Sequence, residues 1–132
     1  LGMSPTEQVI VAHVGRYHRG AAPNRAKHLA FAQLDKRTRA RIKRLSAILR
    51  VADGFDRGHV SSVDKLKVRW MERALRITPV PVPKAKSLRL ELWGASRKAA
   101  LLEKLIGAPV EIIGLDGKVV QPSEGENAEA VD

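Results

Sequence analysis

The densest group of side chains capable of chemistry is the run "RYHR", which covers Arg16 to Arg19. Two guanidinium groups, an imidazole and a phenol lie within four residues, and the planar donors of arginine match the oxygens of a phosphate. The same cations also suit the carboxyl end of a solvated helix, where the helix dipole favours positive charge. The run therefore indicates either an anion site or an ordinary helix end, and composition alone leaves both interpretations open.

Carboxylates accompany arginines in the run "RVADGFDRGH", which begins at Arg50. Asp53 and Asp56 are three residues apart and share one face of a helix, while Arg57 follows Asp53 by four. Aspartates flanked by arginines favour a structural ion pair of Asp53 and Asp56 with Arg50 over a metal ligand or a general base. A metal site would need His18 to meet Asp53 and further ligands besides. We therefore predict no metal ligand and no catalytic residue in this chain.

The remaining histidines indicate no second site. His13 lies among apolar residues and is predicted to be a core histidine. His28 and His59 fall in predicted loops, where nothing in the sequence fixes their geometry. The serines show no nucleophile-elbow spacing, and no glycine-rich phosphate loop is present.

A basic face from Arg37 to Arg44, which includes Arg39, is predicted on the long helix, opposite its apolar stripe. It indicates a surface for a phosphate chain or a nucleic acid, or else a helix face kept in solution by its charge. Of the five aromatic residues, Phe55, Trp70 and Trp93 fall on or next to apolar stripes, which leaves no platform for stacking bases. The predicted polyanion-binding residues are Arg16, His18, Arg19, Lys27, Arg37, Arg41, Arg44 and Arg57.

Charge and composition place the chain among globular domains. Its 132 residues carry a net charge of +10, with 12 basic and 4 acidic residues in the first 59. There is no cysteine, which excludes disulfides, thiolate zinc sites and a cysteine nucleophile. No apolar run approaches the length of a membrane span, and the start lacks the pattern of a signal peptide. We expect a soluble, cytoplasmic domain that binds anions and does not bind membranes.

The first part of the chain, residues 1–60, reads as a helical lobe. Ser4 is predicted to cap a first helix that Gly20 ends, and a short helix is predicted over 28–34. Asp35 is predicted to cap a long helix. The apolar stripe expected on that helix consists of Ile42, Leu45, Ile48, Leu49, Ala52 and Phe55.

Residues 61–121 switch to a period of two and predict a small β-β-β-α-β lobe, so the fold class is α+β. Expected strands cover 65–70, 75–77, 88–92 and 110–113, with a helix over 94–106. Asp116-Gly117 predicts a turn. Residues 122–132 hold four acids and no base, which predicts a disordered acidic tail.

The runs "VIVAHVGRYHRGAAPNRAKHLAFAQL" and "RIKRLSAILRVADGFDRGH" resemble the C-terminal helical region of the Ppx/GppA exopolyphosphatase and guanosine-pentaphosphate phosphatase family. The run "LRLELWGASRKAALLEKLIGAPVEI" resembles the small α/β lobe that ends those proteins. Together the resemblance covers about residues 5–115. It implies that the helical lobe is a partial HD-related domain, in which Asp53 matches the last aspartate of the HD pattern by position.

The resemblance also implies a function. In that family two actin-like lobes precede the helical region and carry the catalytic carboxylate, the phosphate-binding loops and the magnesium site. This chain is then an auxiliary domain, inactive alone and without a cofactor of its own, that binds polyphosphate or a related polyanion and supports a homodimer. Its other partner is the pair of catalytic lobes, in which magnesium is expected. The choice between polyphosphate and guanosine pentaphosphate, and between a truncated piece and a standalone protein, stays open.

Two alternatives remain beside this interpretation. An HD-type metal-dependent phosphohydrolase would need two histidines and an adjacent His-Asp pair, and no His-Asp dipeptide occurs in the sequence. A nucleic-acid-binding module would be distinguished by whether base identity, and not only charge, affects binding.

Overall fold

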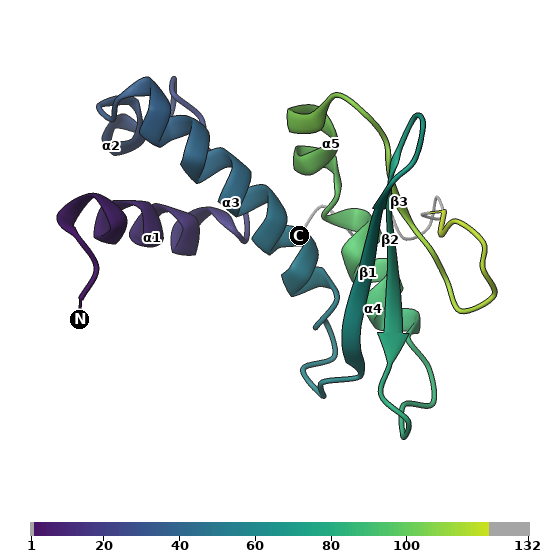
Figure 1. Ribbon diagram of the computed structural model, residues 1–132. Helices are drawn as coiled ribbons and strands as arrows, with labels where there is room; N and C mark the ends of the chain where they lie inside the picture. The colour runs from purple at the N-terminus through teal and green to yellow at the C-terminus, as the bar shows by residue number, and fades with distance from the viewer. Residues whose placement is uncertain (1, 122–132) are drawn as a thin grey trace. The chain divides into compact units, whose positions relative to one another are not determined.

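The computed structural model describes residues 2–121, which form two compact units divided after Arg50 (Figure 1). The first unit holds helices α1 (Pro5–Tyr17) and α2 (Leu29–Ala32) and most of α3 (Lys36–Gly54). The second holds the last turn of α3, strands β1 (Val63–Trp70), β2 (Leu75–Pro81) and β3 (Val110–Ile112), and helices α4 (Arg89–Arg97) and α5 (Ala100–Ile106). Helices with a small mixed sheet make the fold α+β, as the sequence predicts.

Helix α1 begins where the sequence predicts, because Ser4 caps it. The Glu7 N–H donates to the Ser4 Oγ at 3.2 Å, which satisfies one of the free donors at the helix start. The helix ends at Tyr17, and Gly20 beyond it has a left-handed φ of 71°. The core of the first unit is a small cluster of buried side chains, Ile10, Tyr17, Phe31 and Ile42.

Asp35 caps α3, also as predicted. Its Oδ1 accepts from the Thr38 hydroxyl at 2.6 Å and its Oδ2 from the Thr38 N–H at 3.1 Å. The hydroxyl first, and then the N–H, hold the pKa of the Asp35 carboxyl below its ordinary value of 3.8, because both stabilise the ionised form. The cap is therefore sensitive to acid.

We expect Asp35→Asn to make the stability of the first unit less dependent on acid pH. A carboxylate with a depressed folded-state pKa stabilises the fold above its ordinary pKa of 3.8, and the contribution is lost as the pH falls through the folded value. As the pH decreases, the free energy of unfolding should therefore fall more steeply in the unmodified chain than in the variant. Acid titration under mild denaturant measures this difference. A Thr38→Val background removes the donor hydroxyl and should shrink the difference. Parallel curves for the two proteins would contradict this role.

The second unit is built on a hairpin of β1 and β2, beside which β3 runs parallel to β2. Helices α4 and α5 lie on one side of this sheet (Figure 1). The division after Arg50 falls earlier than the predicted boundary at residue 60, because the last turn of α3 belongs to this core. The core residues are Val51, Phe55, Ile77, Ala95, Ala99 and Ile112.

The prediction of a third strand over residues 88–92 is wrong: Leu88 is the N-cap of helix α4, and the helix begins at Arg89. Leu88 and Glu91 are buried while Leu90 is exposed, which is the pattern of a helix and not of a strand. The predicted helix over 94–106 is in fact the end of α4 followed by α5, with a break between Arg97 and Ala100. The second lobe is therefore β-β-α-α-β.

The predicted apolar stripe on α3 is also partly wrong. Ile42 and Phe55 are buried, but Leu45, Ile48 and Leu49 are exposed, as is Ala52. Small side chains allow close packing as well as large ones do, and the prediction counted only the apolar stripe. The buried residues of α3 are Thr38, Ile42, Ser46, Ala47, Val51 and Gly54, and the buried Phe55 directly follows the helix.

The turn predicted at Asp116-Gly117 is present. The Lys118 N–H donates to the Asp116 carboxylate at 3.0 Å, and Gly117 has a φ of 80°. The predicted acidic tail lies outside the described residues. Within residues 2–121, none of the helices has the combination of length and apolar character that crossing a membrane requires.

Candidate polyanion interface

The "RYHR" run lies at the end of α1, where its members take different roles. Tyr17 is fully buried against Phe31, at 5.8 Å between ring centroids, and so is a core residue. The Arg16 guanidinium lies over the Tyr17 ring at 5.1 Å, with the rest of its side chain exposed. The His18 Nδ1 bonds the Gly15 carbonyl at 2.8 Å. Arg16 and the exposed Arg19 are the cations that the run offers to solvent.

Arg50 joins the end of α1 to α3. Its Nε donates to the Tyr17 carbonyl at 2.9 Å, and its Nη2 donates to the Gly20 carbonyl at 2.6 Å. Burial lowers the pKa of the Arg50 guanidinium, which nonetheless stays charged at neutral pH. These contacts satisfy carbonyls beyond the end of a helix, so Arg50 has a structural role in the first unit.

The basic run on α3 separates into two groups. Arg37, Arg41 and Arg44 are exposed and follow one another at spacings of four and three, so they share a face of the helix. Arg39 does not belong to that face, although the predicted basic face from Arg37 to Arg44 includes it. Its Nη1 donates to the Ala32 carbonyl at 3.3 Å and also to that of Leu34, which fixes the end of α2.

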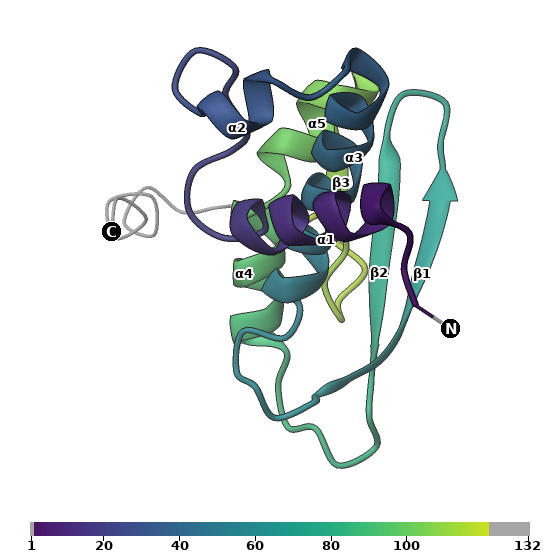
Figure 2. The ribbon, with the colours of Figure 1, turned by 90° about the vertical axis from the view of Figure 1, so that its left-hand side faces the viewer.

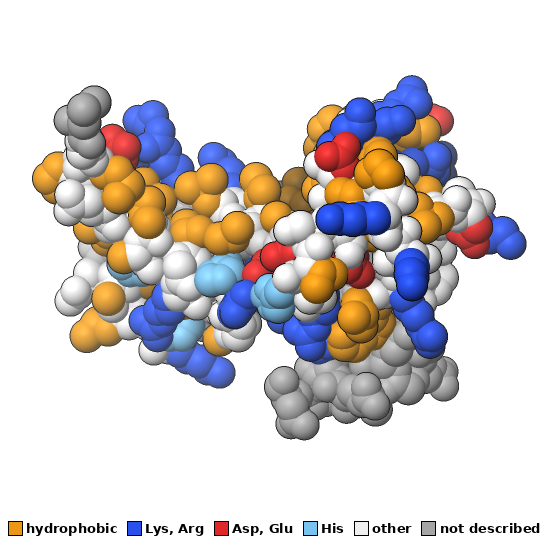
Figure 3. Space-filling model, turned by 90° about the horizontal axis from the view of Figure 1, so that it is seen from below, with side chains coloured by type: hydrophobic (Ala, Val, Ile, Leu, Met, Phe, Trp, Pro, Cys, Tyr) orange, Lys and Arg blue, Asp and Glu red, His pale blue; other side chains and the backbone are white. Residues whose placement is uncertain are grey.

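Arg41 and Arg44 border an apolar groove of about 490 Å³ between α1 and α3. Ile10 and Val11 line it from α1, and Leu45 and Ile48 line it from α3. Figure 3 shows exposed hydrophobic side chains beside Lys and Arg side chains on the surface of this unit. The groove also includes one carboxylate, that of Glu7, so its rim carries both signs of charge.

Lys27 and His28 lie in a loop that is more ordered than the sequence indicates. The Asn24 side chain accepts from the N–H of Lys27 at 3.2 Å, and the Asn24 N–H donates to the His28 Nδ1 at 3.0 Å. The His28 ring also packs 5.1 Å from that of Tyr17. The prediction that nothing fixes His28 is therefore wrong, and the same hydrogen bonds position the exposed Lys27.

Arg57 belongs to the second unit, apart from the other predicted polyanion ligands. Its guanidinium lies 5.4 Å from the centre of the Trp93 ring, and Arg97 lies 4.4 Å from the same ring. Two cations, one from the segment after α3 and one from the end of α4, thus share one indole.

The aspartates of "ADGFD" differ in exposure. Asp56 is exposed, and its Oδ2 lies 3.6 Å from the His59 Nδ1. Asp53 is half-buried, and its pairing with Arg50 stays a prediction. Among residues 2–121, no three histidine, aspartate or glutamate side chains lie together as a metal-binding group.

Two features of the second unit were missed by sequence reasoning. Lys65, Lys67 and Arg69 lie on one face of the exposed strand β1, a second basic surface that their alternation with apolar residues could have revealed. Gly54 and Gly94 meet backbone to backbone, a contact between distant residues that no local pattern signals.

Comparison with known proteins gives no family. The chain matches no family model, and no curated protein resembles it closely enough to count as a relative.

Proposed function

We propose that the chain is a polyanion-binding auxiliary domain of a Ppx/GppA-like exopolyphosphatase and that it holds polyphosphate while catalytic lobes elsewhere in the protein cleave it. The observation that carries the proposal is the exposed face of Arg37, Arg41 and Arg44 on α3. Within residues 2–121, these guanidinium groups make none of the backbone hydrogen bonds that occupy Arg39 and Arg50. Three forked donors along one helix suit a chain of phosphates better than a single anion.

The rest of the first unit supports this chemistry. Arg16, Arg19 and Lys27 are exposed, while the aromatic rings of this unit, Tyr17 and Phe31, are buried. A polymer would therefore meet cations without rings on which bases could stack, which favours phosphate over nucleic acid. The His18 Nδ1 bonds the Gly15 carbonyl, so its Nε2 is the ring nitrogen that would bind a phosphate oxygen.

The proposal assigns hydrolysis to the actin-like lobes that the resemblance implies, together with their magnesium. This chain contributes affinity for the polymer, and a dimer of such domains would double the phosphate-binding sites available to one long chain. The helical unit is then HD-related in descent without acting as a metal centre, and the protein works in the cytoplasm.

Polyphosphate affinity should fall steeply with salt, because each phosphate that binds an arginine releases condensed counterions. Arg41→Ala combined with Arg44→Ala should make the slope of log affinity against log salt shallower by about 0.7 for each phosphate that is no longer neutralised. Titration of polyphosphate of defined length at several salt concentrations measures this. Lys65→Ala with Lys67→Ala removes the same charge from the other unit and is the matched control, which should keep the slope.

Other results would overturn the proposal in distinct ways. Equal flattening by both double variants would mean that overall charge, and not this face, attracts the polymer. Binding that ranks DNA by base sequence would identify a nucleic-acid module. Phosphate release that stays with the chain through repurification would revive the HD-type phosphohydrolase.

A further inference from the structure

Strand β1 is an open edge of the sheet. The strand order is β1-β2-β3, so within the described part of the chain β1 has a partner on one side only. It is eight residues long, and seven of them are exposed. Figure 2 shows β1 at the outer side of the sheet, away from α4 and α5. Natural proteins usually shorten, bend or cover such an edge, because its free N–H and C=O groups pair with other strands.

The hydrogen bonds of β2 show which groups of β1 face outward. The Leu75 N–H donates to Pro109 O at 2.9 Å, and Ile77 O accepts from the Ile113 N–H at 2.9 Å, so both β2 residues turn toward β3. Their partners across the hairpin are Trp70 and Val68. In an antiparallel ladder, residues opposite such a pair direct their own groups away from the partner strand. The N–H and C=O of Leu66, Val68 and Trp70 therefore point to the open edge.

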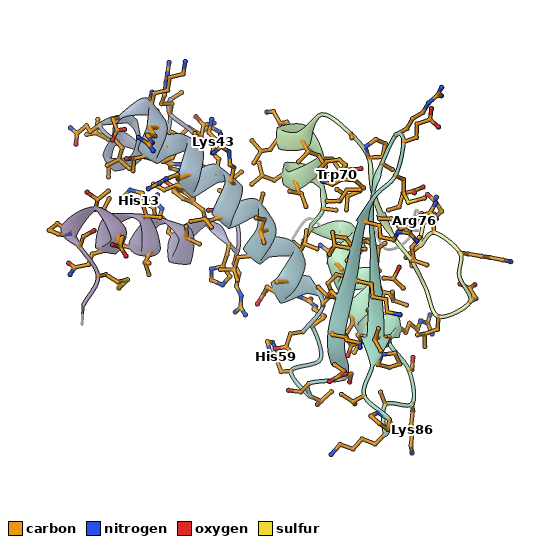
Figure 4. The ribbon with its side chains drawn as sticks, in the orientation of Figure 1. His13, Lys43, His59, Trp70, Arg76 and Lys86 are labelled. Atoms are coloured by element: carbon orange, nitrogen blue, oxygen red, sulfur yellow. The ribbon has the colours of Figure 1, made fainter. Side chains whose placement is uncertain are left out.

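The two faces of β1 differ in chemistry. Leu66, Val68 and Trp70 lie opposite Pro79, Ile77 and Leu75, which are buried, yet they are themselves 38%, 56% and 65% exposed. Figure 4 shows Trp70 on the side of the sheet where the helices lie and Arg76 on the other side. Lys65, Lys67 and Arg69 alternate with the apolar residues and so occupy the face of Arg76.

A second copy of this strand is a poor partner. Residues opposite each other in an antiparallel pair share a face, so pairing around Lys67 would place it against its own copy and Lys65 against Arg69. Like charges directly opposite each other destabilise a ladder. Arg76 opposite Arg69 adds to the positive charge of that face, although Glu111 pairs with Arg76 at 3.1 Å. Like-charge repulsion therefore disfavours pairing between two copies of β1, whereas a strand that carries carboxylates would complement its charge.

We propose that the edge of β1 binds an extended segment of a partner protein in which apolar and acidic residues alternate, and which adds to the sheet as a fourth strand. Apolar residues of the segment would cover Leu66, Val68 and Trp70, and its carboxylates would lie beside the three cations. Its main chain would pair with the outward-facing groups, the mode known as strand addition. This inference does not depend on polyphosphate binding, which involves the other unit.

The test uses the full chain and a seven-residue peptide of alternating valine and glutamate. Binding should slow hydrogen exchange at the amides of Leu66, Val68 and Trp70, which have no ladder partner within residues 2–121. A second peptide with the same side chains carries N-methyl groups at the positions that would donate to β1. It should bind at least tenfold more weakly, because it keeps the charge and lacks the hydrogen bonds. Equal affinity of the two peptides would overturn the proposal.

Variants of β1 test strand addition independently of the modified peptide. Val68→Pro removes one outward N–H and leaves the ladder with β2 intact, a place where an edge strand tolerates proline. The affinity for the peptide should fall at least tenfold. The control Val68→Thr keeps the N–H, and its affinity should stay within threefold of that of the unmodified chain. If Val68→Pro does not fold, the N-methylated peptide still decides the question. Displacement of the peptide by polyphosphate, with no protection of the three amides, would show that charge alone is recognised and would refute strand addition.

Discussion

Gly54→Ala lowers the free energy of unfolding of the second unit by about 2–3 kcal/mol, the upper part of the range of about 1–3 kcal/mol expected for overpacking a core. A Cβ at this position would lie 2.6 Å from the backbone carbon and oxygen of Gly94 and 2.7 Å from the Ala95 Cα. These are backbone atoms and cannot rotate away as a side chain could. The last turn of α3 would have to move away from α4, which would also disturb the packing of Phe55 and Ala95 in the core.

Denaturation followed by tryptophan fluorescence measures this change, since Trp70 and Trp93 both lie in the second unit. Gly15→Ala is the matched control: its Cβ meets nothing within 4 Å, and it lies inside α1. Alanine in an exposed helix is favoured over glycine by up to about 1 kcal/mol, so the control should be neutral or stabilising. Equal stability of Gly54→Ala and the unmodified chain would mean that the two glycines do not meet.

Arg50→Ala is expected to destabilise the first unit by about 2 kcal/mol. The substitution removes two charge-assisted hydrogen bonds, to the carbonyls of Tyr17 and Gly20. Such bonds contribute about 1.5–3 kcal/mol each when shielded, and water can replace part of this at a half-buried site. The destabilisation should appear as earlier melting of the helical signal in circular dichroism.

Two controls separate geometry from charge at this position. Arg50→Lys keeps the charge but cannot donate in two directions from a planar group, so it should recover only part of the stability. Arg37→Ala removes the same charge from an exposed position and should change stability by less than about 0.5 kcal/mol. Equal effects of Arg37→Ala and Arg50→Ala would contradict the structural role of Arg50.

The elements that the sequence predicts well are those decided by nearby residues. Ser4 and Asp35 cap their helices through hydrogen bonds to residues three positions on, and the Asp116 turn closes within two. The prediction for segment 88–92 was wrong because the same leucines are compatible with a helix. Leu88 and Leu92 are four residues apart, a spacing that places both on one helix face. Leu88, Glu91 and Ala95 form that helical face, and a buried glutamate is not part of any hydrophobicity count.

In the candidate site, too, the sequence predicts what nearby residues decide and misses what depends on distant residues. Arginine content identifies a basic surface, but it cannot separate Arg41, which is exposed, from Arg50, whose carbonyl partner at Tyr17 is 33 residues away. The glycine of "ADGFD" is a similar case. Its place in a run that resembles a family motif suggests function, while its contact with Gly94 gives a packing reason that depends on α4.

Helix α3 has a consequence for how the chain acquires its structure. Its 19 residues start in one compact unit and finish in the core of the other, so a single run of backbone hydrogen bonds serves both. Helical segments this short are marginal in water unless tertiary packing supports them. The second unit's share, Val51–Gly54, is a single turn, so it forms as a continuation of the helix that begins in the first unit. We therefore expect the folding of the two units to be coupled through this helix, so that a cut after Arg50 weakens the second core, to which Val51 belongs.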